Sequence, residues 1–435
     1  MITALGFGLM FLIVTLILLR RISPLVAFVT LPVIASALAG FGLSEIGKFI
    51  TEGLKAVAPT ATLFIFAILY FGVMRERGLF APLVNFLLRS TGGKPLAVAV
   101  VTVAVTAVTH LDGIGAATFL LVIPALLPLY LRLGMKREML LCLVVLSAGV
   151  MNMVPWGGTT ARASAVTGID ASQLWISLIP VQAVGLALVM ALAVFLGLRA
   201  QRSFQSHGVI AGHEAAHADD SGDDSRQLSP MSWRYGANLA LTLIILACLF
   251  TGAFPLFACF MVGLGVALVL NYQSLAEQNQ AVLRHASDAM QMALVMLAAG
   301  ILLGVLSGAG MSDGMAHWMI NVLPEGSANW LHVIIGAFGV PLGMLFSPDA
   351  YYFALLPVIR DVAVAAGVDA QAVASAMLIG ENTGFGISPV VPSVYLAIGL
   401  AGVELYKHIR YTVLWAWGIS LVMLAAAVLF GVVTI

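Results

Sequence analysis

The sequence predicts an all-α polytopic membrane protein, an inverted repeat with five transmembrane helices, one re-entrant hairpin and a broken helix in each half. Composition is the first observation: 61% of the 435 residues are hydrophobic and 9% are charged, against about a quarter charged in a soluble domain. The second observation is that polar segments at 152–162 and 381–389 interrupt long apolar runs. Proline and glycine in these segments break helices, and paired broken helices are typical of the central site of a secondary transporter.

In the first half, apolar windows long enough to cross a bilayer predict five helices. They lie at about 2–19, 24–42, 57–74, 138–170 and 174–198. Residues 79–90 are short and amphipathic, which favours a helix along the membrane interface. Residues 95–131 are interrupted at 109–115, and each side has only about 15 residues. We expect a re-entrant hairpin there, with two thin spans as the alternative.

The apolar pattern stops at 201–233, where Asp, Gly and Ser residues take over. This composition predicts a solvated cytoplasmic linker between a first repeat at 1–200 and a second repeat at 234–435. Three histidines, His207, His213 and His217, lie in the linker without cysteines beside them. A flexible polar loop is the preferred interpretation over a metal site.

The second half repeats the plan of the first. Its predicted spans lie at about 236–253, 255–271, 288–308, 370–403 with a break, and 407–433. An interfacial stretch is expected at 312–323, and a second hairpin at 330–359 is interrupted at 347–352. Asp112 and Asp349 mark the two hairpin tips. Because each half has an odd number of spans, the second copy is inserted upside down.

The placement of Lys and Arg tests this topology. With the N-terminus outside, sixteen of the 20 basic residues fall on the cytoplasmic side, three fall outside, and Arg162 lies within the membrane. The positive-inside rule thus favours ten spans and both termini outside a bacterial inner or plasma membrane. The first hairpin then opens to the cytoplasm and the second to the outside. Basic and acidic residues balance at 20 each, so no net charge attracts nucleic acid.

Four ionisable side chains are predicted at membrane depth: Asp112, Arg162, Asp349 and Glu381. Each costs at least about 2.5 kcal/mol there, which makes each a functional candidate. Arg162 lies beside two threonines and suits an anion, because its guanidinium fork matches a carboxylate. The three acids suit a proton or a metal cation and are the candidates for proton coupling. The alternative is that these charges only pair with one another to hold the broken helices together.

The candidate substrate-binding residues are those of the two breaks and the two hairpin tips. They are His110, Asp112, Gly113, Asn152, Pro155, Gly157, Gly158, Thr159, Thr160, Arg162, Asp349, Asn382, Thr383, Ser388 and Pro389. Helix N-termini freed at these places point positive dipole ends at the same anion. An enzyme is not expected, because the one His-Glu-x-x-His match, at 213–217, lies in the predicted linker and the one Gly-x-Ser-x-Gly match, at 310–314, has no predicted strand before it.

At these residues the chain resembles the citrate–divalent metal:proton symporters, the CitMHS family of the ion transporter superfamily, over nearly its full length. The resemblance rests on segments 66–72, 111–113, 152–158, 347–353, 388–395 and 399–405. It implies a homodimer of elevator type that takes up citrate bound to a divalent metal by proton symport. Asp112 and Asp349 would then contact metal only as part of a metal–citrate substrate of the Mg or Ca type, and no cofactor would be permanently bound.

The chain departs from the family pattern at the first hairpin tip. The family pattern is Leu-Asp-Gly-Asp-Gly followed by hydroxyl residues, whereas this tip has Ile114 at the second acidic position and Ala116 and Ala117 before Thr118. Fewer hard oxygen ligands remain for Mg²⁺ or Ca²⁺. Another free dicarboxylate, tricarboxylate or hydroxycarboxylate is therefore an alternative substrate, and a cation/proton antiporter of the same superfamily is an alternative function.

Overall fold

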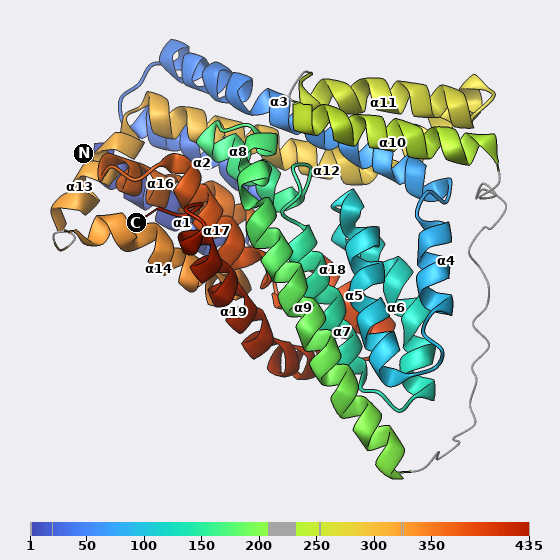
Figure 1. Cartoon of the computed structure of the whole chain (residues 1–435). Coiled ribbons are helices and arrows are strands. Elements are labelled where there is room, and N and C mark those ends of the chain that lie inside the picture. The colour runs from blue at the N-terminus through green and yellow to red at the C-terminus, as the bar shows by residue number, and fades with distance from the viewer. Residues whose placement is uncertain are drawn as a thin grey trace.

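The structure is a computed structural model that describes residues 2–19, 21–207, 232–251, 254–322, 324 and 326–434. Every regular element among these residues is a helix, as the sequence predicts. The helices form two groups, and both chain ends lie on the same side of the molecule (Figure 1). The predicted site residues all lie in one of these groups.

The first group, here called the long-helix group, contains two apolar helices of 34 residues each that pack against each other. Its members are α1 (Ile2–Leu18), α2 (Pro24–Leu38), α3 (Leu43–Glu76), α10 (Trp233–Thr251), α11 (Leu256–Asn271) and α12 (Leu275–Gly308). Helix α3 packs along α12, with α2 and α11 beside them. A Cβ atom at Gly53 would collide with the carbonyl of Gly300, and one at Gly304 with the carbonyl of Phe49. Small residues thus let these helices approach closely, as is common in membranes.

The second group, here the broken-helix group, contains both polar interruptions. Its members are α5 (Pro95–Thr109), α6 (Gly115–Arg132), α7 (Arg137–Met151), α8 (Gly158–Thr167), α9 (Ala171–His207), α14 (Leu331–Ala337), α15 (Gly339–Leu345), α16 (Leu356–Ala365), α17 (Ala370–Asn382), α18 (Pro392–Ala401) and α19 (Leu405–Leu429). Helices α5, α6, α7 and α9 lie together below the long-helix group (Figure 1). The short helices α4 (Ala81–Arg89) and α13 (Met311–Val322) occupy the two segments predicted as interfacial.

Six described helices are long and apolar enough to cross a membrane, or up to eight if each of two bent pairs is one span. Helices α1, α2, α10 and α11 are shorter apolar helices that fall below this length. With the 3₁₀ turn at His110–Asp112, the first hairpin arm reaches 18 residues and passes the same test as α6. The count of ten spans and the choice between a hairpin and two thin spans therefore stay predictions.

Three predicted boundaries were wrong because polar helix ends extend beyond their apolar windows. Helices α3 and α12 each have 34 residues, more than the predicted 57–74 and 288–308. Ser274 caps α12 by accepting a hydrogen bond from the Glu277 N–H at 3.2 Å. The two residues form a capping box, which can start a helix within a polar sequence. Helix α9 continues to His207, since 201–207 contains no Gly or Pro. The rest of the predicted linker, 208–231 with His213 and His217, lies outside the described residues.

The first arm of the second hairpin is kinked. Helices α14 and α15 meet at 65°, followed by the turn at 346–349 and a π-helical segment η4 (Ala350–Leu355) that continues into α16. Pro341 in α15 cannot donate to the carbonyl of Ala337, four residues earlier. The indole of Trp417 donates to that carbonyl instead, at 2.7 Å. The kink is thus stabilised by α19.

Candidate functional site

The first break separates α7 from α8. Pro155 removes a backbone donor from the helix, and two threonines of α8 donate to the carbonyls left over. Thr159 Oγ1 donates to the carbonyl of Asn152 at 3.2 Å, and Thr160 Oγ1 donates to that of Met153 at 3.0 Å. Backbone groups at a break inside a membrane require such partners. The two hydroxyls therefore hold the break open at fixed geometry.

The second break runs from the end of α17 through a 3₁₀ turn, η5 (Phe385–Ile387), to α18. Here side chains from neighbouring helices also satisfy the backbone. His408 of α19 shares a hydrogen bond of 3.0 Å with the carbonyl of Gly386, and the Tyr395 hydroxyl donates to that of Pro389 at 2.8 Å. The second break is thus as well satisfied as the first.

The two breaks contact each other. Asn152 Nδ2 donates to Asn382 Oδ1 at 3.2 Å, and the same oxygen lies 2.9 Å from Thr159 Oγ1, whose single proton it shares with the Asn152 carbonyl. Asn152, Thr159 and Asn382 are all buried. Gly149 allows this approach, because a Cβ atom there would collide with the Asn382 carbonyl. Residues far apart in the sequence therefore form one polar centre inside the apolar interior.

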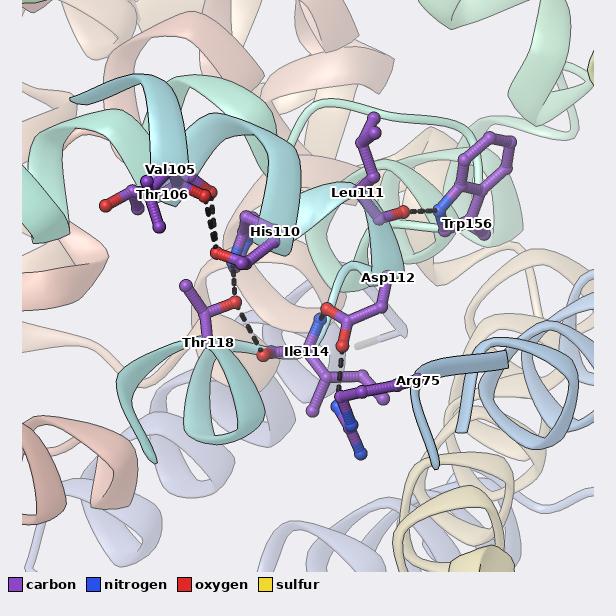
Figure 2. Close-up of polar contacts among 10 residues, drawn as sticks. Arg75, Val105, Thr106, His110, Leu111, Asp112, Ile114, Thr118 and Trp156 are labelled. Atoms are coloured by element: carbon purple, nitrogen blue, oxygen red, sulfur yellow. Dashed lines mark hydrogen bonds and ion pairs between the residues drawn. The ribbon is translucent and has the colours of Figure 1, made fainter. Parts of the chain in front are cut away.

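The tip of the first hairpin binds the end of α3 (Figure 2). Asp112, which is 2% exposed, accepts from Arg75 Nη1 at 2.6 Å and from the Ile114 N–H at 2.9 Å. The Trp156 indole of the first break donates to the Leu111 carbonyl at 2.6 Å. The tip is therefore attached both to the long-helix group and to the first break.

Two further features fix the shape of this tip. His110 is fully buried, and its Nδ1 lies 2.8 Å from Thr118 Oγ1 across the hairpin (Figure 2). Gly113 has φ of 71°, a left-handed conformation that favours glycine. A Cβ atom there would also lie 3.2 Å from the Trp156 carbonyl oxygen. His110 in this position holds the two arms together.

The tip of the second hairpin forms an ion pair with α8. Arg162 Nε and Nη2 both lie 2.8 Å from Asp349 Oδ1, and Nη1 donates to the Gly158 carbonyl at 2.8 Å. The Arg162 and Asp349 side chains are 10% and 17% exposed. Arg162 is therefore not the lone charge that its sequence position suggested. Its partner is one of the acids predicted at the same depth.

Glu381 is the remaining acid predicted at membrane depth, and its surroundings differ from those of the two aspartates. It is 1% exposed, and its Oε2 accepts from the Tyr352 hydroxyl at 3.0 Å. Thr383 donates to the Ala416 carbonyl of α19 at 3.0 Å. Ser388 is buried, and among the described residues its hydroxyl has no hydrogen-bond partner.

A cavity of about 740 Å³ lies between the two helix groups. Arg162, Ser347 and Asp349 line it from the broken-helix group, and Arg21 and Gln291 line it from the long-helix group. This volume is within the range of small-molecule sites, about 300–1,000 Å³. The ion pair of the second tip is thus accessible to a small solute.

The structure distributes the predicted residues over three places. Arg162 and Asp349 face the cavity; Asn152, Pro155, Gly157, Gly158, Thr159, Thr160, Asn382, Thr383, Ser388 and Pro389 form the two breaks; His110, Asp112 and Gly113 form the first tip. Asp112 is not a lining residue of the cavity. The sequence does not predict Arg75 as the partner of Asp112. Arg75 follows the apolar run 57–74 and is one of the sixteen basic residues that the topology places on the cytoplasmic side.

An all-helical membrane protein in which two broken helices meet at a buried polar centre has the architecture of a solute transporter. Solved structures share this fold. The Alcanivorax borkumensis YdaH transporter is 16% identical with a TM-score of 0.63, covering 90% of this chain and 89% of that one. MtrF of Neisseria gonorrhoeae is 16% identical with a TM-score of 0.60, covering 89% and 84%. At such identity the likeness shows the fold alone.

The chain belongs to the citrate transporter family, CitMHS, which matches residues 1–380. It is 38% identical over 434 residues to a Bacillus subtilis (strain 168) protein named citrate transporter. It is 36% identical over 437 residues to the Mg²⁺/citrate complex secondary transporter of the same organism. Both matches cover 100% of each chain. The resemblance read from the sequence is confirmed, and the family consists of transporters and not enzymes.

Proposed function

We propose that this protein is a secondary active transporter that imports citrate, bound to a divalent metal, by proton symport. The observation that carries the proposal is the Arg162–Asp349 ion pair facing a cavity of ligand size. A guanidinium fork matches a carboxylate, and a carboxylate oxygen is a hard ligand that suits Mg²⁺ or Ca²⁺. One relative is named for transport of a Mg²⁺/citrate complex, which supports the same substrate here.

Binding proceeds by an exchange of partners. A substrate carboxylate takes the place of Asp349 on Arg162, and Asp349 then contacts the metal that the substrate brings. No group of three His, Cys, Asp or Glu side chains that could hold a metal occurs in the described part of the chain. Most metal ligands would therefore come from citrate itself. The metal is part of the substrate in this proposal.

A free dicarboxylate or tricarboxylate is the second candidate substrate. The observation in its favour is that Asp112 is engaged by Arg75 and by the Ile114 amide and does not line the cavity. Among the described residues that line the cavity, Asp349 would then be the one acidic side chain that could contact a metal. A site with one such ligand binds a hydrated metal complex less tightly than a site with several.

The coupled proton is carried by Glu381 in this proposal. Transport follows an elevator motion, in which the broken-helix group moves across the membrane against the long-helix group. The location of the cavity between the groups supports this motion. The inverted repeat, the homodimer and the outside position of both termini in a bacterial inner membrane are part of the same proposal.

Uptake of radiolabelled citrate into proteoliposomes tests the proposed function. Citrate is offered alone, with Mg²⁺, with Ca²⁺, and with or without an imposed pH gradient. We expect accumulation that requires a divalent metal and an acidic exterior. Accumulation of free citrate that is unaffected by metal would favour the second candidate. No accumulation of any carboxylate under any condition would refute both.

A further inference from the structure

A second arginine lines the cavity, and neither the family comparison nor the predicted site residues assign it a role. Arg21 lies in the turn between α1 and α2, and it lines the same cavity as Arg162. Arg21 belongs to the long-helix group and Arg162 to the broken-helix group. The two arginines therefore line the cavity from different helix groups.

The backbone N–H of Arg21 and the start of the helix that follows it are hydrogen-bonded. The Arg21 N–H donates to the Leu16 carbonyl at 3.0 Å, which closes the end of α1. Ser23 caps α2 by accepting from the Val26 N–H at 3.3 Å, and Pro24 begins that helix. The turn thus presents its arginine from a defined position.

No described acidic side chain forms an ion pair with Arg21. Its side chain is exposed and makes no hydrogen bond or ion pair with any residue that the structure describes. Arg162 and Asp349 neutralise each other. Among the described charged residues that line the cavity, one positive charge is therefore uncompensated, and it is on Arg21.

We propose that Arg21 binds a third carboxylate of the substrate, while Arg162 and the metal engage the other two, which gives the site its preference for tricarboxylates over dicarboxylates. The proposal rests on the proposed function. A tricarboxylate with one divalent metal carries a single net negative charge, which complements the single uncompensated charge of the cavity. Gln291 of α12, on the same wall, offers an amide donor to the same anion.

This arrangement makes the site depend on the relative position of the helix groups. A substrate held by Arg21 and Arg162 spans the gap between them. If the groups slide against each other, the contact with Arg21 is lost while that with Arg162 persists. Arg21 therefore strengthens binding in one state of the transport cycle and not in the other.

The test is equilibrium binding to the purified full chain by isothermal titration calorimetry, with citrate and with malate, which has one carboxylate fewer, each with Mg²⁺. We expect Arg21→Gln to weaken citrate binding about tenfold, as for loss of one charge-assisted contact, and to leave malate binding nearly unchanged. Arg21→Lys keeps the positive charge but lacks the guanidinium fork, so its citrate affinity should lie between those of the wild type and Arg21→Gln. Arg89→Gln is the matched control, because Arg89 is also exposed, ends α4, and does not line the cavity.

The outcomes separate this proposal from the proposed function. Equal citrate affinity in Arg21→Gln and the wild type, with Arg162→Ala impaired, overturns the role of Arg21 alone. An equal loss for citrate and malate also overturns it, because that pattern indicates a general electrostatic effect. A wild-type protein that binds neither anion overturns the proposed function and this proposal with it. If Arg21→Gln does not fold, the ratio of citrate to malate affinity in Arg21→Lys decides.

Discussion

Replacing Arg162 tests the proposed binding step most directly. Its guanidinium makes three contacts of 2.8 Å, two with Asp349 and one with the Gly158 carbonyl. Arg162→Lys keeps the charge but cannot form a fork. A charge-assisted hydrogen bond contributes about 1.5–3 kcal/mol, so loss of one of two contacts with a carboxylate weakens binding by about tenfold to a hundredfold. We expect this loss in citrate binding by isothermal titration calorimetry and in the KM for uptake.

Arg162→Ala has a second consequence, because it leaves Asp349 without its partner in a mostly buried position. Removing one partner of such a pair costs up to about 3–5 kcal/mol of stability. The double variant Arg162→Ala/Asp349→Ala should recover thermal stability but not citrate binding. Arg360→Lys is the control, because Arg360 also forms a part-buried ion pair, with Asp361, and does not line the cavity. Unchanged citrate affinity in a folded Arg162→Ala protein would refute the reasoning.

Three further predictions concern the proton, the first tip and the topology. Glu381→Gln should abolish the dependence of uptake on the pH gradient while leaving exchange of citrate for citrate; normal gradient-driven accumulation would exclude Glu381 as the proton carrier. Arg75→Gln should lower stability by about 3 kcal/mol, because Asp112 is 2% exposed, and adding Asp112→Asn should restore part of it; additive losses would show that the pair is not coupled. Single cysteines at positions 94 and 136, in place of Lys94 and Lys136, should react with an impermeant reagent from the same face of the membrane. Labelling from opposite faces would refute the prediction of a first hairpin and of an inverted repeat.

Much of the helical framework could be predicted from the sequence because its causes are local. Apolar length marks the helices, and Pro155 with its neighbouring glycines marks the first break. The kink between α14 and α15 was missed, because Pro341 lies in an apolar run and the Trp417 indole that satisfies the break is distant in the sequence. The full lengths of α3 and α12 are not predicted from the sequence, because polar residues extend a helix beyond its apolar window without a hydrophobic signal.

The kinds of site residue could be predicted, but their partners could not. Arg162 and Asp349 were both expected at membrane depth, yet they are 187 positions apart, and sequence periodicity carries no information on such pairs. Asp112 and Arg75 are 37 positions apart, and a charge at the end of an apolar helix reads as a solvated residue. Partner choice depends on how the two helix groups pack, which is a property of the whole fold.

The pairing of the charges argues for Glu381 as the carrier of the coupled proton. Protonating Asp112 or Asp349 would leave an arginine without its counter-charge, which is costly in a nonpolar interior. Among the described residues, the Glu381 carboxylate is hydrogen-bonded by the Tyr352 hydroxyl and forms no ion pair. A proton on Glu381 therefore removes an unpaired charge and does not create one. Glu381 directly precedes Asn382, which contacts the first break, so its charge state can affect the arrangement of both breaks.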